Sequence, residues 1–393
     1  MRIIHICPDE KFIDAVWETF ESLEPGKNRY LVLGDDRELR YISKARVEFI
    51  GKQPWNNQKL YIQLREASCV ILHSLNIEHI RLINSRYMED VNFVWLGFGY
   101  DYYDYIAGSV SGLCLSRTAA LVRSSKQGVI QWLSKCAKKA KLRGVLVRYL
   151  KRKAIKRINF FSPVLEVEYD LVKAAFFSST NFPKVARYNY GVNAKFFDAL
   201  GCQEAVIPGP NILLGNSANP TNNHIEAIEL LADLELGGRL VITPLSYGYR
   251  DRSYIEKVCK YGRQKLGDNF KPLVGFLPYQ EYVDLLSSCG FVLMNHKRQQ
   301  ALGNIQMQVA RGATVFLRKE NPIYSWYEEI GVIVCDIDSI SSCRGIVDLA
   351  LDLVVCDMNR RIVVENFGWN AHLNRTRKFI EQVTYPLLSK PTF

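Results

Sequence analysis

Length, composition and charge already restrict what this chain can be. It has 393 residues, of which 48% are hydrophobic and 23% are charged, so it is long enough for two globular domains and too apolar to be intrinsically disordered. Its ten cysteines are scattered without a C-x-x-C pair, which argues against a zinc site or a disulfide framework.

The N-terminus shows no sign of export or membrane insertion. The apolar run in RIIHICPDEKF is too short for a signal peptide. No apolar run reaches the roughly 18–20 residues that a transmembrane helix needs. We therefore expect a protein of the cytoplasm, with free thiols.

The net charge of +11 is concentrated in one segment. Between Tyr105 and Leu165 there are 14 Lys and Arg residues and no Asp or Glu, and the rest of the chain has 37 basic residues against all 40 acidic ones. A solvated helix face alone does not account for a run of charges of a single sign over this length. It indicates a surface for anions, such as a lipid membrane or a nucleic acid.

The first half of the chain alternates short apolar runs with helical patterns. Residues 127–158 then predict a cationic amphipathic helix, or a helix pair broken at Gly144, within a basic amphipathic segment that covers 117–158. Strands are predicted over 2–7, 29–35, 67–75 and from 91 into the loop GFGYDYYDY, helices over 12–23 and 77–87, and a helix, a strand and a loop over 165–191.

The second half repeats a strand, a polar loop and a helix. These units cover residues 211–234, 238–267, 271–290, 291–313 and 314–331, and a last strand covers 332–337. Continuous apolar strands alternating with helices predict parallel sheets covered on both faces. We expect an α/β fold of two Rossmann-like, doubly wound domains over 1–200 and 205–368, joined near 201–210, with a C-terminal helix in 369–393.

Three strand-end loops of the second half share a polar, glycine-containing character. They are Gly215-Asn216-Ser217, Ser246-Tyr247-Gly248-Tyr249 and Lys297-Arg298-Gln299-Gln300, the last followed by Gly303. Helix N-termini and Arg side chains hold phosphate oxygens well. No G-x-x-x-x-G-K-[ST] or G-x-G-x-x-G motif occurs, so these loops predict a nucleotide-diphosphate site without a P-loop or a dinucleotide fingerprint. No metal or other cofactor is expected.

Several stretches of the second half resemble one enzyme family. ILLGNSANPTNNHIEAIELL, YQEYVDLLSSCGFVLMNHKRQQALGNIQM and RKENPIYSW are similar to the C-terminal domain of the TDP-N-acetylfucosamine:lipid II N-acetylfucosaminyltransferases, glycosyltransferase family 56. The first half resembles that family only loosely, in HICPDEKF, ILHSLN and FVWLGFGYDYYDY, and it lacks the family's Trp-Gly-Ala-Asp-like loop.

The resemblance implies a GT-B glycosyltransferase with two domains facing a central cleft. It implies a TDP-activated deoxyamino sugar as donor, of the 4-acetamido-4,6-dideoxygalactose type. The acceptor would be a polyprenyl-diphosphate-linked saccharide, used for enterobacterial common antigen or an O-antigen-like polysaccharide. Other nucleotide sugars, UDP- or GDP-linked, and a binding module without catalysis remain alternatives. In the acceptor domain, the basic segment favours an anionic inner-membrane surface over nucleic acid.

Residue roles follow from the loops and the resemblance. Arg298 and Lys297 are expected to hold the leaving diphosphate, and a catalytic base is sought among Asp101, Asp9 and His73, with His5 as an alternative. Membrane contacts are assigned to Lys138, Lys139, Lys151 and Arg152. The remaining donor-site candidates are Gly215, Asn216, Ser217, Tyr247, Gly248, Tyr249, Phe276, Leu277, Tyr279, Gln299, Gln300, Gly303, Asn304, Glu320 and Asn321, with Glu328 as a weaker addition.

Overall fold

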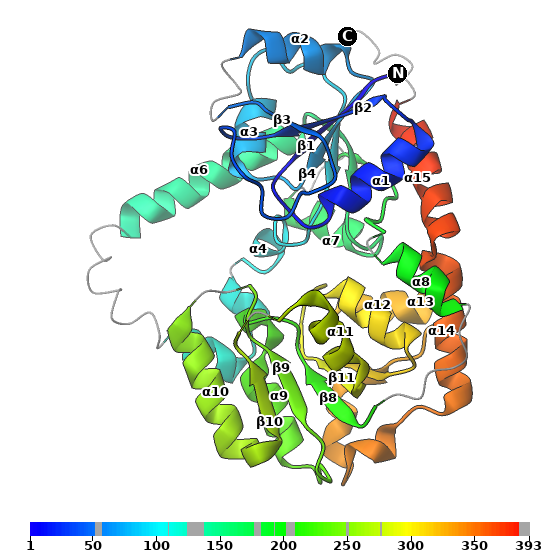
Figure 1. The fold of residues 1–393 in the computed structure, drawn as a ribbon. Coiled ribbons are helices and arrows are strands. Elements are labelled where there is room, and N and C mark those ends of the chain that lie inside the picture. Colours follow the sequence, from blue (N-terminus) through cyan, green and yellow to red (C-terminus); the bar gives the residue numbers. More distant parts are fainter. Residues whose placement is uncertain are drawn as a thin grey trace. The chain divides into compact units, whose positions relative to one another are not determined.

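The computed structural model describes residues 1–51, 57–108, 110–123, 137–176, 182–191, 193–201, 209–248, 251–275 and 277–384 (Figure 1). The chain divides into two compact units. Unit 1 comprises Met1–Ile106, Lys135–Val192 and Trp369–Phe393, and unit 2 comprises Ala107–Ser134 and Asn193–Gly368.

Unit 1 is built on a parallel sheet of seven strands. Their order is β3-β2-β1-β4-β5-β6-β7, which places the topological switch point of a doubly wound sheet between β1 and β4. Ile3 of β1 pairs with Asn28 of β2 on one side and with Cys69 of β4 on the other. The strands are β1 (Ile3–Cys7), β2 (Asn28–Val32), β3 (Val47–Phe49), β4 (Cys69–His73), β5 (Phe93–Leu96), β6 (Ile158–Ser162) and β7 (Lys184–Val185).

The helices of unit 1 cover this sheet. The C-terminal helix α15 (Trp369–Thr384) packs against α1 (Ile13–Leu23), as Figure 1 also shows. Phe379, Ile380 and Val383 of α15 join the core formed around β1 and α1, so the end of the chain completes the first unit. The other helices are α2 (Gln58–Glu66), α3 (Ile77–Ile83), α4 (Tyr103–Ile106), α6 (Ala137–Ile155) and α7 (Glu168–Phe176).

Unit 2 repeats the same architecture with six parallel strands. Their order, β10-β9-β8-β11-β12-β13, is the 3-2-1-4-5-6 order of the Rossmann fold, with the switch point between β8 and β11. The strands are β8 (Asn211–Leu214), β9 (Val241–Pro244), β10 (Phe270–Leu273), β11 (Cys289–Met294), β12 (Thr314–Leu317) and β13 (Cys335–Asp336).

Local capping fixes where several helices of unit 2 begin. The Asp251 carboxylate accepts from the backbone N–H groups of Ser253 and Tyr254 at the start of α10. Asn321 caps α13, which opens with Pro322. The helices are α8 (Ala194–Gly201), α9 (His224–Ala232), α10 (Arg252–Leu266), α11 (Tyr279–Ser287), α12 (Leu302–Ala310), α13 (Pro322–Glu329) and α14 (Leu353–Phe367). The 3-10 turns are η2 (Val110–Leu113) in the segment 107–134, then η3 (Pro220–Asn222), η4 (Gly267–Asn269), η5 (Ile337–Ser342) and η6 (Ile346–Leu349).

The predicted fold class is confirmed, and several local expectations change. α6 runs through Gly144 without a break, because the helix bonds tolerate a glycine at moderate cost. β3 and α2 were missed, and α3 ends at Ile83 rather than near residue 87. The units are not two contiguous halves, since the described residues 110–123 belong to the second unit and α15 belongs to the first. Among the described helices, none combines the length and apolar composition needed to cross a bilayer.

Candidate functional site

The loop after β8 stands at the switch point of unit 2, and its backbone allows only glycine at one position. Gly215 has φ +67°, and a Cβ there would lie 2.6 Å from Oδ1 of Asn222. The left-handed conformation disfavours other residues, and the close approach excludes even a methyl group unless Asn222 moves. Gly215 therefore brings the loop backbone against the Asn222 amide.

Asn222 holds this loop with both ends of its side chain. Its Oδ1 accepts from the backbone N–H of Asn216 at 3.0 Å, and its Nδ2 donates to the carbonyl oxygens of Ser217 (3.0 Å) and Asn219 (2.8 Å). The Gly215-Asn216-Ser217 loop predicted as part of the donor site is thus held rigidly from η3.

His296 approaches the same amide oxygen from the loop after β11. Its Nε2 lies 2.7 Å from Oδ1 of Asn222, and because that oxygen accepts, Nε2 must donate. The ring is fully buried. Burial, reinforced by the nearby Arg298 charge, holds the pKa of His296 well below 6.5, so the ring is neutral. Nδ1 is then an unprotonated acceptor, and it has no hydrogen-bond partner in the described part of the chain.

The Gln300 side chain links the loop after β11 to the loop after β8 by hydrogen bonds. Its Oε1 accepts from Oγ1 of Thr221 at 2.6 Å, and its Nε2 donates to Oδ1 of Asn216 at 2.8 Å. Ala301 follows in the left-handed region with φ 60°, a conformation that costs a non-glycine residue about 1–2 kcal/mol. This turn directs the chain into α12. We call residues 215–217, 221–223 and 295–300 the amide cradle.

Lys297 and Arg298 lie at the rim of the amide cradle and are half-buried. Arg298 donates from Nη1 to the carbonyl oxygen of Gln299 at 3.0 Å. The neighbouring Gln299 is buried. Gly303 and Asn304 lie in the first turn of α12, where the Gly303 carbonyl oxygen accepts from Nδ2 of Asn193 at 2.9 Å. The amides predicted from the sequence and these two cations therefore lie together at the carboxyl-terminal edge of the sheet of unit 2.

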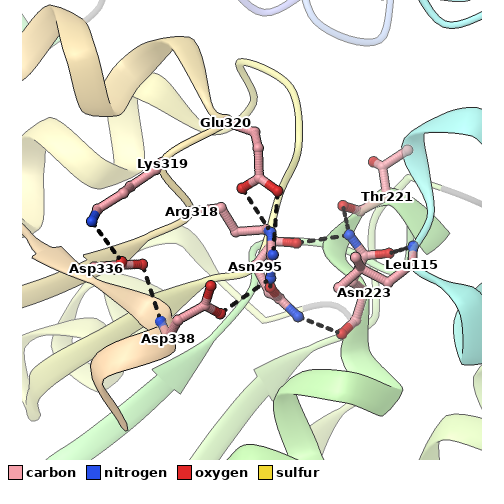
Figure 2. A network of polar contacts seen from close by, with 9 residues as sticks. All are labelled: Leu115, Thr221, Asn223, Asn295, Arg318, Lys319, Glu320, Asp336 and Asp338. Carbon is pink, nitrogen blue, oxygen red and sulfur yellow. Dashed lines mark hydrogen bonds and ion pairs between the residues drawn. The ribbon is translucent and has the colours of Figure 1, made fainter. Parts of the chain in front are cut away.

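Within the amide cradle, Asn223 and Asn295 form a reciprocal pair (Figure 2). Asn223 Nδ2 donates to the carbonyl oxygen of Asn295 at 2.7 Å, and Asn295 Nδ2 donates to the carbonyl oxygen of Asn223 at 3.2 Å. Oδ1 of Asn295 accepts from Nη1 of Arg318 at 3.2 Å. The ends of β11 and β12 are joined in this way.

Glu320 and Asn321 follow β12. Glu320 forms an ion pair with Nε of Arg318 at 3.2 Å and is more than half exposed. Burial raises its pKa, but backbone hydrogen bonding and Arg318 outweigh that effect and leave the pKa lowered. Asn321 is buried and uses Oδ1 to cap α13 through the Ile323 N–H. Glu328 is exposed on α13.

The loop after β9 lies against the β8 loop. The Tyr247 carbonyl oxygen accepts from the Ala218 N–H at 2.8 Å, and the Tyr247 side chain is 53% exposed. A Cβ on Gly248 would stand 3.3 Å from Cβ of Ser217. Leu277 is half-buried just before α11. Tyr249, Phe276 and the Tyr279 side chain, all predicted donor contacts, lie outside the described residues.

The three candidate bases of unit 1 have structural surroundings instead. Both carboxylate oxygens of the buried Asp101 are taken: Oδ2 accepts from the Leu75 N–H and Trp95 Nε1, each at 2.8 Å, and Oδ1 accepts from the Phe98 N–H at 2.9 Å. The sequence placed Asp101 in an open strand-end loop, but these donors turn the carboxylate inward. These three hydrogen bonds give the Asp101 carboxylate a structural role in unit 1, and its expected role as the catalytic base stays a prediction.

Asp9 and His73 also have structural partners, and their expected roles as catalytic bases stay predictions. Asp9 accepts from three successive backbone N–H groups, those of Arg40, Tyr41 and Ile42, at 2.8 to 3.2 Å. His73 is fully buried and lies 3.0 Å from the His5 ring and 3.3 Å from the Tyr190 hydroxyl. Burial and the neighbouring histidines hold the pKa of His73 far below 6.5. His5, the alternative, is equally buried, and burial lowers its pKa to about 3.

The basic helix α6 is only partly a surface for anions. Lys151 is buried: its Nζ donates to the backbone oxygen of Asp101 and lies 4.3 Å from the Tyr105 ring centroid. Its expected membrane contact is therefore wrong, since the helix turns this position toward β5 and α7. Arg152 is exposed. The side chains of Lys138 and Lys139 lie outside the described residues.

Sequence reasoning missed the residues that hold the amide cradle together. Asn222, Asn223, His296, Asn295 and Arg318 were not among the predicted site residues. A signal existed, because Asn222 and His224 form the Asn-x-His of the family pattern, and His296 directly follows a buried strand. Polar residues beside apolar runs are often buried only when something pairs with them, and that pairing is invisible in the sequence.

The architecture of the two units defines the class of this protein. Solved structures of similar fold include a glycosyltransferase from Rickettsia africae (TM-score 0.63, 13% identity) and sucrose-phosphate synthase from Thermosynechococcus elongatus (TM-score 0.65, 10% identity), with coverage of 98% of this chain and 99% of each of those chains. At these identities the likeness concerns the fold, which is GT-B.

The sequence then identifies the chemistry. Residues 192–374 match the family described as 4-alpha-L-fucosyltransferase, glycosyl transferase group 56. This is the family that the sequence motifs predicted, and the prediction is confirmed over these residues. The chain is a glycosyltransferase.

Proposed function

We propose that this glycosyltransferase moves a deoxyamino sugar of the 4-acetamido-4,6-dideoxygalactose type from a TDP-sugar to a polyprenyl-diphosphate-linked saccharide. The product would enter a surface polysaccharide such as enterobacterial common antigen or an O-antigen-like chain. The observation that carries the proposal is that the family match, over residues 192–374, spans the whole amide cradle, from the loop after β8 to the loop before α12.

The amide cradle suits a nucleotide diphosphate. The loops that follow the parallel strands β8 and β11 lie at the switch point of the sheet, which is where open α/β sheets bind their ligands. Arg298 and Lys297 stand at its rim, where their charges would offset the negative charge that develops on the leaving diphosphate. In this proposal side-chain cations take the part that a metal ion plays in other transferases, and activity is expected to survive EDTA.

A neutral His296 adds a feature that suits polar recognition. Its unpaired Nδ1 is an acceptor enclosed by the cradle loops. An unsatisfied buried acceptor costs about 1–3 kcal/mol, and a ligand N–H or O–H group would remove that cost. The Tyr247-Gly248 loop, which lies against Ser217, would cover the bound donor.

Membrane association forms the second part of the proposal. On the solvent side of α6, Val145, Leu146 and Tyr149 are 54–64% exposed, and the exposed Arg148 and Arg152 lie beside them. Apolar side chains with cations around them fit an anionic lipid surface. The enzyme would then work as a peripheral protein on the cytoplasmic face of the bacterial inner membrane, close to its lipid-linked acceptor.

A donor screen tests the first part. Thermal shift with TDP, UDP and GDP should show the largest stabilisation with TDP, and incubation with TDP-sugars and a lipid-linked acceptor should give a product of the expected mass. Preference for UDP or GDP would reassign the donor. If no nucleotide shifts the melting temperature at millimolar concentration, the proposed function fails.

Vesicle flotation tests the second part. The variant Val145→Ser/Leu146→Ser/Tyr149→Ser should lose binding to anionic vesicles, and wild-type binding should weaken with salt. The matched control is Ile62→Ser, which removes another exposed apolar side chain, on α2. Equal binding of the wild type to DNA and to vesicles would show that the cations are not selective for membranes.

A further inference from the structure

A segment that follows unit 1 in the sequence is built into unit 2 beside the amide cradle. We call residues 110–123 the strap. Its helical residues 116–123 begin on the Glu226 carboxylate: Oε1 accepts from the backbone N–H groups of Arg117 and Thr118, each at 2.9 Å, and Oε2 accepts from Oγ1 of Thr118 at 2.5 Å. A carboxylate at this end satisfies helix N–H groups that have no partner within the helix.

Apolar packing holds the strap to the same unit. Leu121 and Val122 pack against the core cluster around α9, and Thr118 is fully buried. Arg117 forms an ion pair with Glu229, one turn further along α9. The strap is thus docked through a cap and an ion pair on α9 and through apolar contacts with the core of unit 2.

Asn223 joins the strap to the amide cradle. Its Oδ1 accepts from the Leu115 N–H of the strap at 2.7 Å, while its Nδ2 donates to the Asn295 carbonyl oxygen at the start of the cradle loop. The residue has φ 52°, which asparagine tolerates better than most residues. One amide group therefore serves the strap with its oxygen and the cradle with its nitrogen.

The connection continues to the end of β12. Asn295 accepts from Arg318, which is paired with Glu320. Hydrogen bonds therefore run from the strap through Asn223, at the start of α9, to the ends of β11 and β12 (Figure 2). Every step joins groups that are buried or half-buried, except the last, because Glu320 is exposed. Shifting the strap must therefore disturb Asn223 and the cradle loop that it holds.

We propose that the strap is part of the donor site, with Asn223 as the positioning residue that couples strap docking to the conformation of residues 295–300. The coupling is a property of unit 2, and the proposal rests on the proposed function only for the ligand that fills the amide cradle. Coupling is reciprocal: a bound nucleotide stabilises the docked strap, and the docked strap favours the cradle that binds it.

Two variants separate the two sides of the Asn223 amide. Glu226→Gln weakens the cap of the strap without changing either residue of the Asn223–Asn295 contact. Asn223→Asp keeps an acceptor for Leu115 but places a carboxylate oxygen against the Asn295 carbonyl. The control is Glu256→Gln, which removes an exposed carboxylate from α10. All three are made in the full chain.

Hydrogen–deuterium exchange without nucleotide first tests whether the strap is coupled to residues 295–300. Glu226→Gln should speed exchange of the amides of 115–122 and also of 296–300, and the double variant should add little in 296–300 beyond Asn223→Asp alone. The control should match the wild type. If Glu226→Gln changes only the strap, or if the effects of the two variants on 296–300 add fully, the coupling is absent.

Nucleotide binding then tests whether the docked strap favours the donor site, and a purely structural role of the strap would not change this affinity. With TDP as the probe, the strap amides of the wild type should exchange more slowly, and Glu226→Gln should raise the TDP Kd about tenfold, within the usual range of coupling, at a temperature where the variant remains folded. An unchanged Kd with a freed strap would overturn the proposal. If TDP, UDP and GDP all fail to bind the wild type, the proposed function fails, and the exchange measured without nucleotide still decides the coupling.

Discussion

Replacing Asp101 by asparagine separates a catalytic base from a structural carboxylate. Three N–H donors, from Leu75, Trp95 and Phe98, point at the two carboxylate oxygens. Asparagine offers one oxygen and one NH₂ group, so at least one of these donors must face another donor. The remaining hydrogen bonds also lose their charged acceptor.

The cost follows from these contacts. A hydrogen bond to a charged group contributes about 1.5–3 kcal/mol, and losing one while weakening two should destabilise unit 1 by about 3 kcal/mol. For a unit of this size each kcal/mol lowers the melting temperature by about 2–4 °C, which predicts a fall of roughly 6–12 °C. Lys151 adds to the cost, because its buried ammonium lies against the backbone of Asp101.

Thermal melting and turnover should be measured on the same preparation. We expect Asp101→Asn to melt early and to keep most of its turnover when assayed well below the melting transition. The control Asp90→Asn alters an exposed ion pair with Arg65 and should change stability by no more than about 0.5 kcal/mol. A variant that melts like the wild type but has lost its turnover would refute the structural role and restore Asp101 as the base.

Three further predictions concern the cradle and the histidines. Gly215→Ala should destabilise the fold by about 1–2 kcal/mol through backbone strain, and it should weaken nucleotide binding because the added Cβ meets Asn222. The control Gly238→Ala, at φ +79° with open space around it, should show the strain alone. Equal nucleotide affinity in the two variants would contradict a role of the amide cradle in nucleotide binding. Arg298→Ala should raise the donor KM and lower kcat, because charge on the leaving diphosphate grows in the transition state; unchanged steady-state kinetics would remove Arg298 from the site. Finally, all six histidines are buried with lowered pKa values, to about 3 for His5 and His224 and about 4 for His79 and His372, each mainly through burial. The unfolded chain therefore binds more protons as the pH falls through 6.5, so stability is complete well above that pH. At pH 5 it falls by about 2 kcal/mol for each of the four histidines whose pKa is about 3 or 4, and His73 and His296 act in the same direction. Unit 1 holds four of the six (His5, His73, His79 and His372) and should melt first in calorimetry at pH 5, whereas equal midpoints at pH 5 and pH 7 would show that the histidines do not control acid stability.

The sequence predicted the two α/β units and most of the amide cradle for a local reason. Buried strands and amphipathic helices leave their periods in adjacent residues, and a glycine or a cluster of amides at a strand end marks a loop with special backbone geometry. Gly215, Asn216 and Gln300 could be chosen in this way, because parallel strands bring their carboxyl ends to one edge.

What the sequence could not determine is which groups the polar residues contact. Asp101 and Lys151 resemble a catalytic base and a surface cation until the fold supplies Leu75, 26 residues from Asp101, and the aromatic rings around the Lys151 ammonium. Asn223 meets Leu115 from 108 residues away. Local patterns predict strands, helices and loops, but burial and hydrogen-bond partners depend on distant parts of the chain. Only the tertiary structure therefore showed which of these polar side chains are buried and paired and which are exposed.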